Sequence, residues 1–149
     1  MIPSARSYRR GVNDFRRLVV WQRAHEAALE SYRATRAFPL DERFGLTAQL
    51  RRAAVSVAAN IAEGCGRASA RDEGRFLQIA LGSARELEYH LLLARDLGLL
   101  DPEAHARLHG LSVATQKMLT ALLLRASRSP SRGHSRQPPA VGLRPSANG

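Results

Sequence analysis

Apolar side chains recur every three or four residues in four successive segments, which is the spacing of helices with one buried face. The first segment spans about residues 18–37, and the second follows Asp41, a predicted helix N-cap. The third follows a second predicted N-cap, Ser69, and the fourth follows Asp101-Pro102, a capping residue before proline at the first helical position. The expected core stripes are Val20, Ala24, Ala28, Tyr32 and Thr35; Leu46, Leu50, Ala53, Ala54, Val57 and Ile61; Phe76, Ile79, Ala80, Ser83, Leu87, Leu91, Ala94 and Leu97; and Ala104, Leu108, Leu111, Thr115, Met118 and Leu122.

The breaks between these segments are short. Phe38-Pro39 ends the first, because proline disfavours the helical state in the residue before it. Gly64 or Gly66 is expected to end the second in a left-handed conformation, and Gly98 closes the third. Short connections force long helices to run antiparallel to their neighbours. The pattern therefore predicts an all-α fold, an antiparallel up-down-up-down four-helix bundle.

The two ends of the chain differ from this central part. Residues 18–126 form the predicted bundle, residues 1–17 a basic extension, and residues 127–149 a Ser/Pro/Arg-rich tail expected to be disordered. The formal net charge of +10 belongs mostly to these ends, because acidic and basic residues nearly balance within the bundle. All but one of the 23 basic residues are Arg, which fits phosphate binding and equally fits the codon bias of a GC-rich genome.

Length and composition narrow the class of protein. A chain of 149 residues holds one small domain with a real core. No apolar run approaches the roughly 18 residues that a membrane-spanning helix needs. Arg9-Arg10 has no apolar stretch behind it, and the single cysteine permits no intramolecular disulfide. We therefore expect a cytoplasmic protein without a membrane partner.

Residues 64–69 resemble a phosphate-binding loop, because two glycines precede a helix. Such loops follow a β-strand, whereas this segment follows a helix. Helix capping by Gly64, Gly66 and Ser69 explains the same residues without a ligand. We favour the capping interpretation.

Arginines flank this part of the chain. Arg67, Arg71 and Arg75 are spaced one helical turn apart, and Arg51 and Arg52 lie earlier in the second helix. These five residues are the candidate nucleic-acid-binding residues, because guanidinium groups suit phosphate contacts. The alternative is that they are solvated and paired with nearby carboxylates.

Three further patterns resemble metal or catalytic sites. His105 and His109 have the i, i+4 spacing of two metal ligands on one helix face, and Glu86 and His90 repeat it. Di-iron bundles instead use Glu-x-x-His, and use it twice. Cys65 has no histidine close in sequence to act as its base. We therefore expect no catalytic residue, no metal and no cofactor.

Asn60 and Glu63 are polar residues in a helix otherwise rich in Ala, Val and Ile, with Ser56 one turn earlier. An ionisable group in such a setting could act as a general acid or base. The structural interpretation, which we favour, has Asn60 hydrogen-bonding across helices or to a loop backbone. Glu63 then pairs with Arg67 or with an arginine of a neighbouring helix.

The second and third helices each carry a second apolar stripe beside the core stripe. A bundle helix needs one core face, so a second face predicts contact with another subunit, most simply in a symmetric homo-oligomer. These stripes comprise Ala48, Val55, Ala58, Ala59 and Ala62, and Leu77, Leu81, Ala84, Leu92 and Leu99.

Three segments in order resemble the four-helix-bundle protein family, also called the ribosomal-RNA intervening-sequence protein family: LVVWQRAHE (18–26), GLTAQLRRAAVSVAANIAEGCGR (45–67) and FLQIALGSARELEYHLLLARDLGLL (76–100). The resemblance covers about residues 14–123, and the family commonly has proline where this chain has Ala58. The signature positions that match are Gln49, Arg51, Arg52, Ser56, Asn60, Glu63 and Gly64, then Gly82, Ser83, Glu86 and Glu88.

The resemblance implies a bundle that assembles into a ring, a homopentamer, with no established enzymatic activity. It also implies kinship with the accessory variability protein of diversity-generating retroelements, a basic bundle that associates with a reverse transcriptase and nucleic acid. Our first hypothesis is therefore a non-enzymatic oligomer that binds RNA or DNA, or a reverse transcriptase-like protein. The alternative is a protein–protein interaction scaffold without nucleic-acid contact. A third hypothesis, a hydrolase or metal enzyme, would be supported only by Glu63, Cys65 and the pair His105 and His109.

Overall fold

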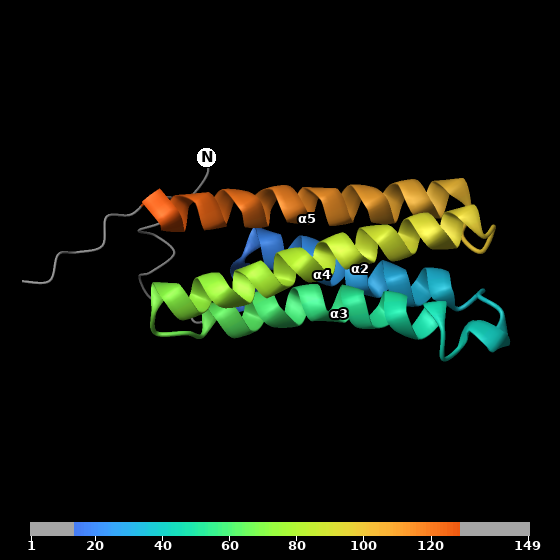
Figure 1. Cartoon of the computed structure of the whole chain (residues 1–149), viewed down its shortest axis with the longest axis horizontal. Helices are drawn as coiled ribbons and strands as arrows, with labels where there is room; N and C mark the ends of the chain where they lie inside the picture. The colour runs from blue at the N-terminus through green and yellow to red at the C-terminus, as the bar shows by residue number, and fades with distance from the viewer. Residues whose placement is uncertain (1–13, 129–149) are drawn as a thin grey trace, which may run out of the picture.

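A computed structural model describes residues 14–128, and four long helices account for most of them. The elements are the 3-10 turn η1 (Phe15–Arg17), α2 (Val19–Thr35), the 3-10 turn η2 (Leu40–Glu42), α3 (Leu46–Cys65), α4 (Ala70–Asp96) and α5 (Pro102–Arg128). Successive helices run in opposite directions (Figure 1), which confirms the predicted antiparallel four-helix bundle. The predicted tail beyond residue 128 and the first 13 residues of the N-terminal extension lie outside the described residues.

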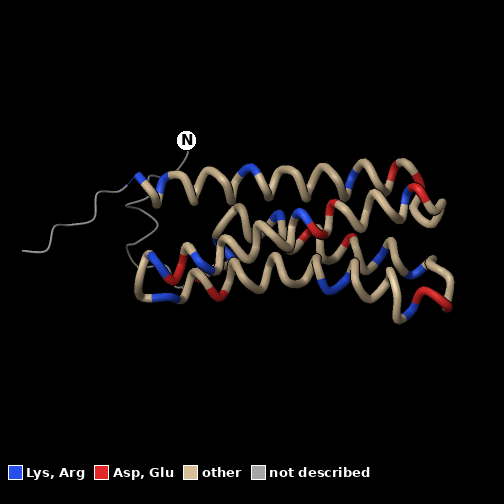
Figure 2. Tube along the Cα trace, viewed as in Figure 1, with Lys and Arg blue, Asp and Glu red and all other residues tan. Residues whose placement is uncertain are grey.

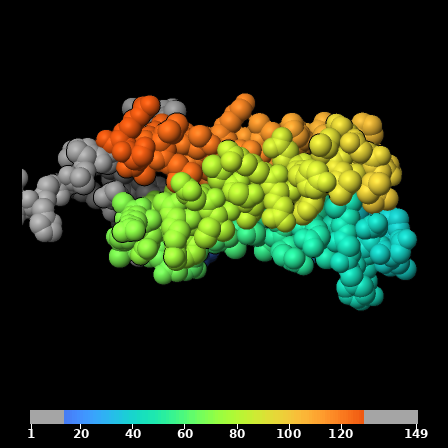
Figure 3. All heavy atoms as spheres, viewed as in Figure 1, coloured from blue at the N-terminus to red at the C-terminus, as the bar shows by residue number. Residues whose placement is uncertain are grey.

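Each helix contacts its two neighbours in the bundle. α3 packs against α2 and α4, and α5 packs against α4 and α2. The face seen in Figure 3 is formed by α4, with α3 on one side of it and α5 on the other. No helix within residues 14–128 is long and apolar enough to cross a membrane.

The core consists of two hydrophobic clusters, one towards each end of the bundle. One cluster includes Phe38, Leu50, Leu91 and Leu108, and the other includes Val57, Ile61, Leu77 and Leu119. Each fully buried leucine contributes roughly 2 kcal/mol through the removal of apolar surface from water. These contacts of α3 and α4 with both neighbours hold the polar and basic side chains described below in fixed positions.

Parts of the predicted core stripes are wrong. Tyr32, Ile79 and Leu97 are 44%, 45% and 57% exposed. Leu77 and Ala84, expected on a second face of the third helix, are buried in the core. In α4 the buried positions alternate between spacings of three and four residues, as packing against two neighbouring helices requires. Apolar residues lie on both sides of these buried positions, so the periodicity of the sequence alone could not tell which apolar residues of α4 are buried.

Two of the three predicted N-caps are confirmed. The Ser69 Oγ accepts from the backbone N–H of Asp72 at 3.1 Å, and an Asp101 carboxylate oxygen accepts from that of Ala104 at 2.8 Å. Asp41 is not the cap of α3, because it belongs to η2, and α3 begins five residues after it, at Leu46. There the Glu42 carboxylate accepts from the N–H of Leu46 at 3.0 Å, so the longer acidic side chain supplies the cap.

The expectation for Gly64 and Gly66 is confirmed in one respect and wrong in another: Gly66 is the C-cap of α3, but neither glycine has the left-handed conformation. Gly66 has a φ of −85°, which is ordinary right-handed backbone, and Gly98 is the glycine with positive φ among residues 14–128. Gly64 is buried inside α3, where an added Cβ would lie 3.1 Å from the Phe76 Cβ and 3.3 Å from the Glu73 carbonyl oxygen. Gly64 is therefore needed for the close approach of α3 to α4 rather than for a helix cap.

Candidate nucleic-acid interface

The five candidate arginines fall into two separate groups. Arg67, Arg71 and Arg75 surround the turn between α3 and α4, whereas Arg51 and Arg52 lie in the first half of α3. At about 1.5 Å per residue, Arg52 and Arg67 are roughly 20 Å apart along the helix axis. The structure thus brings together three of the five and separates the other two.

The first group belongs to what we call the basic end of the bundle, formed by η1, the α3–α4 turn and the last turns of α5. Basic positions cluster there in Figure 2, and residues 14 and 128 both lie at this end. Its arginines outnumber its carboxylates. The arginines are Arg16, Arg17, Arg67, Arg71, Arg75, Arg125 and Arg128, and the carboxylates are Asp14, Glu63, Asp72 and Glu73.

Phe76 orders two of these arginines. The guanidinium carbon of Arg67 lies 4.6 Å from the centroid of the Phe76 ring, and that of Arg75 lies 5.3 Å from it. Arg67 also forms the expected ion pair with Glu63. Each exposed cation–π contact contributes about 0.5–1 kcal/mol. Arg71 and Arg75 further line a depression of about 790 Å³ that reaches Leu123 of α5.

The second group lies on the side of the bundle formed by α2 and α3. Here a depression of about 510 Å³, which we call the arginine depression, is lined by Tyr32, Arg43, Thr47, Ala48, Arg51, Arg52, Val55 and Ser56. The guanidinium carbon of Arg51 lies over the Tyr32 ring at 4.5 Å. The Arg51 Nε donates to Thr35 Oγ1 at 2.8 Å. Sequence reasoning assigned Tyr32 and Thr35 to the core and so missed both contacts.

The polar signature residues form a seam between α3 and α4. Asn60 donates to the backbone oxygen of Ser56 at 2.8 Å and to its Oγ at 3.0 Å, so its bonds stay within α3. The expectation that Asn60 itself crosses to another helix is wrong, because Ser56 makes that link. The Ser56 and Ser83 hydroxyls are 2.8 Å apart.

Three further signature residues, Gln49, Gly82 and Glu86, lie on the surface of the bundle. Gln49 accepts from Arg52 at 3.5 Å, and Glu86 is 3.9 Å from the His90 Nε2. Gly82 is exposed, with open space where a Cβ would stand. These positions therefore carry no core packing in a single chain.

The residues considered for metal binding or catalysis are not grouped into a site. Within residues 14–128, no three His, Cys, Asp or Glu side chains are placed to hold a metal ion. The rings of His105 and His109 stack at 5.5 Å, and burial, with the neighbouring Arg95, lowers the pKa of His105. The His109 Nε2 is 3.2 Å from a Glu88 carboxylate oxygen. Cys65 is half-buried at the last position of α3.

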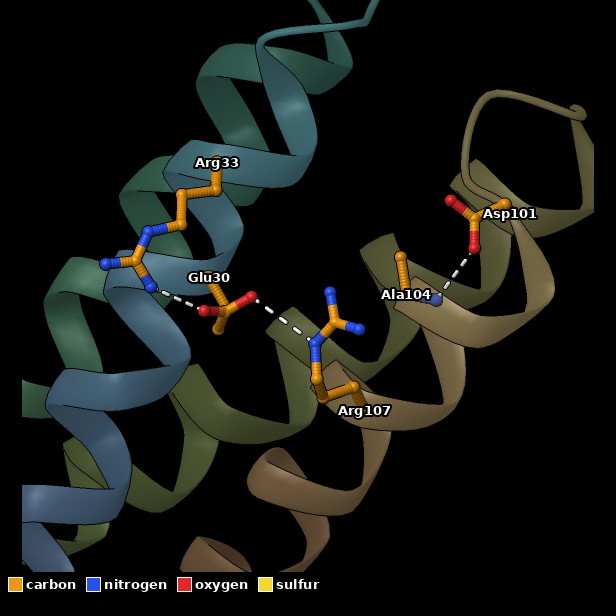
Figure 4. Close-up of polar contacts among 5 residues, drawn as sticks. All are labelled: Glu30, Arg33, Asp101, Ala104 and Arg107. Atoms are coloured by element: carbon orange, nitrogen blue, oxygen red, sulfur yellow. Dashed lines mark hydrogen bonds and ion pairs between the residues drawn. The ribbon is translucent and has the colours of Figure 1, made fainter.

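Two carboxylates join helices in ways that the sequence did not indicate. Glu30 of α2 lies between Arg33 and Arg107 of α5 (Figure 4), and its Oε2 is 3.4 Å from the Arg107 Nε. The hydrogen bond from Arg33 lowers the pKa of Glu30. Glu88 of α4 accepts from Gln116 of α5 at 2.6 Å. Only the i, i+3 spacing of Glu30 and Arg33 is visible in the sequence.

The fold and these surfaces define a small, basic, antiparallel four-helix bundle. A model of the 23S rRNA-intervening sequence protein family matches residues 16–121, and the chain belongs to that family. A solved structure from Bacteroides thetaiotaomicron, described as a protein with unknown function from the S23 ribosomal protein family, is similar in sequence and fold. The two share 27% identity and a TM-score of 0.63, over 70% of this chain and 98% of that chain. A comparison with curated proteins finds no match.

Proposed function

We propose that this protein is a non-enzymatic, self-associating bundle that binds nucleic acid as an accessory factor, with the basic end as its main contact. The observation that carries the proposal is the gathering of arginines at one end of the bundle, where both termini of the described chain also lie. Phosphate backbones are bound chiefly through such concentrations of Arg and Lys.

The residues beyond the described part extend the same charge in sequence. Residues 1–13 contain Arg6, Arg9 and Arg10, residues 129–149 contain Arg132, Arg136 and Arg144, and neither segment contains Asp or Glu. The described part of the chain begins and ends at the basic end, so these segments join the bundle there in sequence. Tethered cations add to the electrostatic attraction of a polyanion.

The kind of nucleic acid that we propose is RNA. The name of the matched family refers to sequences that intervene in 23S rRNA, and the name of the similar structure's family refers to a ribosomal protein. A protein partner of the same complex, such as a reverse transcriptase-like protein, is compatible with this role. The guanidinium of Arg67, stacked on Phe76, suits contacts to phosphates, which carry no sequence information.

Self-association is part of the proposal. Ala59 and Ile79 are exposed small or apolar residues of α3 and α4, and they lie one helical turn from Ser56 and Ser83 of the seam. Burial of this strip against another copy would remove apolar surface from water. Light scattering of the 16.4 kDa chain is expected to give a multiple of that mass, a homopentamer being the specific expectation. A monomer at micromolar concentration would contradict it.

The experiment that tests nucleic-acid binding measures the salt dependence of RNA affinity for the full chain and two triple variants. We expect Arg67→Gln/Arg71→Gln/Arg75→Gln to weaken binding at least ten-fold at low salt, and to make the plot of log affinity against log salt less steep. The control Arg23→Gln/Arg36→Gln/Arg85→Gln removes the same charge elsewhere and should change affinity much less. Equal losses would assign binding to net charge alone. Absence of RNA and DNA binding by the full chain would leave the protein–protein scaffold, whose partner should survive nuclease and high salt.

A further inference from the structure

The arginine depression on α2 and α3 is a second positive surface, separate from the basic end. Its lining includes three arginines and no Asp or Glu. Arg43, Arg51 and Arg52 take part in none of the ion pairs formed within residues 14–128. Their charge is therefore not neutralised inside the bundle and is available to an anion.

Arg51 is held in one orientation by contacts from α2. Thr35 Oγ1 donates to the Ser31 carbonyl oxygen at 2.7 Å, which leaves its oxygen lone pairs to accept from the Arg51 Nε. The Tyr32 ring supports the guanidinium from one side. The terminal nitrogens of Arg51 take no part in the bond to Thr35. Because the side chain is already ordered in the folded protein, less conformational entropy is lost when a ligand binds.

Aromatic and apolar groups accompany these cations. Tyr32 is 44% exposed, and Phe44, next in the chain to Arg43, is 86% exposed. The Arg43 guanidinium carbon lies 5.3 Å from the centroid of the Phe44 ring, so a second arginine–aromatic stack involves an arginine that lines the depression. Ala48 and Val55 add an apolar floor. The surface thus offers both charge and planar faces.

We infer that the arginine depression binds single-stranded nucleic acid in preference to duplex, with phosphates on Arg43, Arg51 and Arg52 and bases stacked on Tyr32 and Phe44. A duplex presents phosphates but keeps its base faces stacked inside, so it would use the arginines and leave the aromatic rings unused. A single strand supplies both groups, and base–aromatic stacking is tolerant of sequence. The depression is open, which suits a strand passing across it better than an enclosed small molecule.

This inference rests on the proposed function and adds the form of nucleic acid that is bound. Its test compares the affinity of the full chain for an oligouridine of about 16 nucleotides, which stays single-stranded, with its affinity for a mixed-sequence RNA duplex. We expect tighter binding of the single strand. The variant Tyr32→Leu/Phe44→Leu keeps every charge, and it should weaken single-strand binding about ten-fold or more while leaving duplex binding unchanged.

Matched controls separate stacking from charge and from damage to the fold. Tyr89→Leu removes another exposed aromatic, from α4, and should leave both affinities unchanged. Arg51→Gln should weaken single-strand binding, whereas Arg85→Gln, an equal loss of charge on α4, should not. Unchanged thermal unfolding monitored by circular dichroism confirms that each variant is folded.

The outcomes distinguish this inference from the proposed function. Equal affinity for single strand and duplex, or equal effects of Tyr32→Leu/Phe44→Leu and Tyr89→Leu, overturns the inference while RNA binding at the basic end stands. If Arg51→Gln loses binding to an acidic protein and keeps its affinity for RNA, the ligand of the depression is a protein. That result would also overturn the inference. If the full chain binds neither RNA nor DNA, the inference falls together with the proposed function.

Discussion

The two ends of the bundle use their charged residues differently. At the basic end, Arg67 and Arg75 stack on Phe76, and Arg67 pairs with Glu63 four residues before it in the chain. The opposite end, which we call the acidic end, contains the α2–α3 connection and the α4–α5 turn. Its charged residues are Arg36, Asp41, Glu42, Arg43, Arg95, Asp96, Asp101 and Glu103.

Two of the five carboxylates at the acidic end accept hydrogen bonds from backbone N–H groups at helix starts. Asp101 caps α5 and Glu42 caps α3, so both serve the ends of helices. Asp96 pairs with its neighbour Arg95. The comparison indicates that the capping carboxylates at the acidic end contribute to stability, whereas much of the charge at the basic end remains available to a ligand.

The turns at the two ends differ in the same way. Gly98 at the acidic end has a φ of +72°, and the N–H groups of Gly98 and Leu99 donate to the carbonyls of Arg95 and Ala94 at 2.9 Å, the Schellman pattern. The turn at the basic end has no left-handed residue and depends on the contact of Gly64 with α4. One turn needs glycine for its backbone angles, and the other needs it for space.

The largest effect is expected from Gly64→Val at the basic end. Its side chain would overlap the Phe76 Cβ and the backbone of Glu73, and a helix backbone cannot move as a flexible side chain can. We expect a loss of about 2–3 kcal/mol in the free energy of unfolding, measured by urea denaturation.

Gly110→Ala in α5 is the control for this substitution, because nothing lies within 4 Å of the added Cβ. There alanine should raise stability by about 0.5–1 kcal/mol through its better helix propensity. A stability change near zero for Gly64→Val would show that α3 and α4 can separate at this end without cost.

The second prediction concerns Gly98. Gly98→Val should lower the free energy of unfolding by about 1–2 kcal/mol, because a β-branched residue is strained at positive φ. Gly98→Asn should cost less, since asparagine tolerates this conformation. At Gly64, asparagine should be destabilising like valine, because space and not the backbone angle limits that position. Thermal or urea unfolding of all the variants tests whether the two glycines have different roles.

The third prediction compares the caps of α5 and α4. Asp101→Ala at the acidic end and Ser69→Ala at the basic end should each cost about 1 kcal/mol of stability. The Asp101 contact to the N–H of Ala104 is drawn in Figure 4. Neither substitution should change RNA affinity more than two-fold or so, because neither removes an arginine. A large loss of binding in Ser69→Ala alone would show that the start of α4 contacts the ligand directly.

The helix caps, the turn at Gly98 and the ion pair within one helical turn could be predicted from the sequence, because each depends on residues close together in the chain. Ser69 and Asp101 cap their helices, and Gly98 closes α4, as their chemistry requires. The ion pair of Glu63 with Arg67 follows from i, i+4 spacing. Asp41 failed as a cap because Glu42, one residue on, reaches the same helix start with a longer side chain.

The candidate site could be predicted only in part, since it depends on which helix faces meet. Arg51 and Arg67 were recognised as arginines near one motif, but roughly 15 residues of helix separate them in space. The partners of Arg51, Tyr32 and Thr35, come from another helix and were assigned to the core. Gly64 resembled a cap because sequence cannot report the distance between α3 and α4.

The smallest expected effect is a pH dependence at the acidic end. Burial, together with Arg95 and His109, lowers the pKa of His105 in the folded protein below its ordinary value of about 6.5. Between these two pKa values the unfolded chain binds a proton that the folded chain does not. The stability due to neutral His105 is therefore complete above about pH 6.5 and is lost as the pH falls through the folded pKa. His105→Gln should flatten this part of the curve of unfolding free energy against pH. An unchanged slope in His105→Gln would show that the start of α5 opens enough to hydrate this ring, and that the acidic end is less rigid than its caps imply.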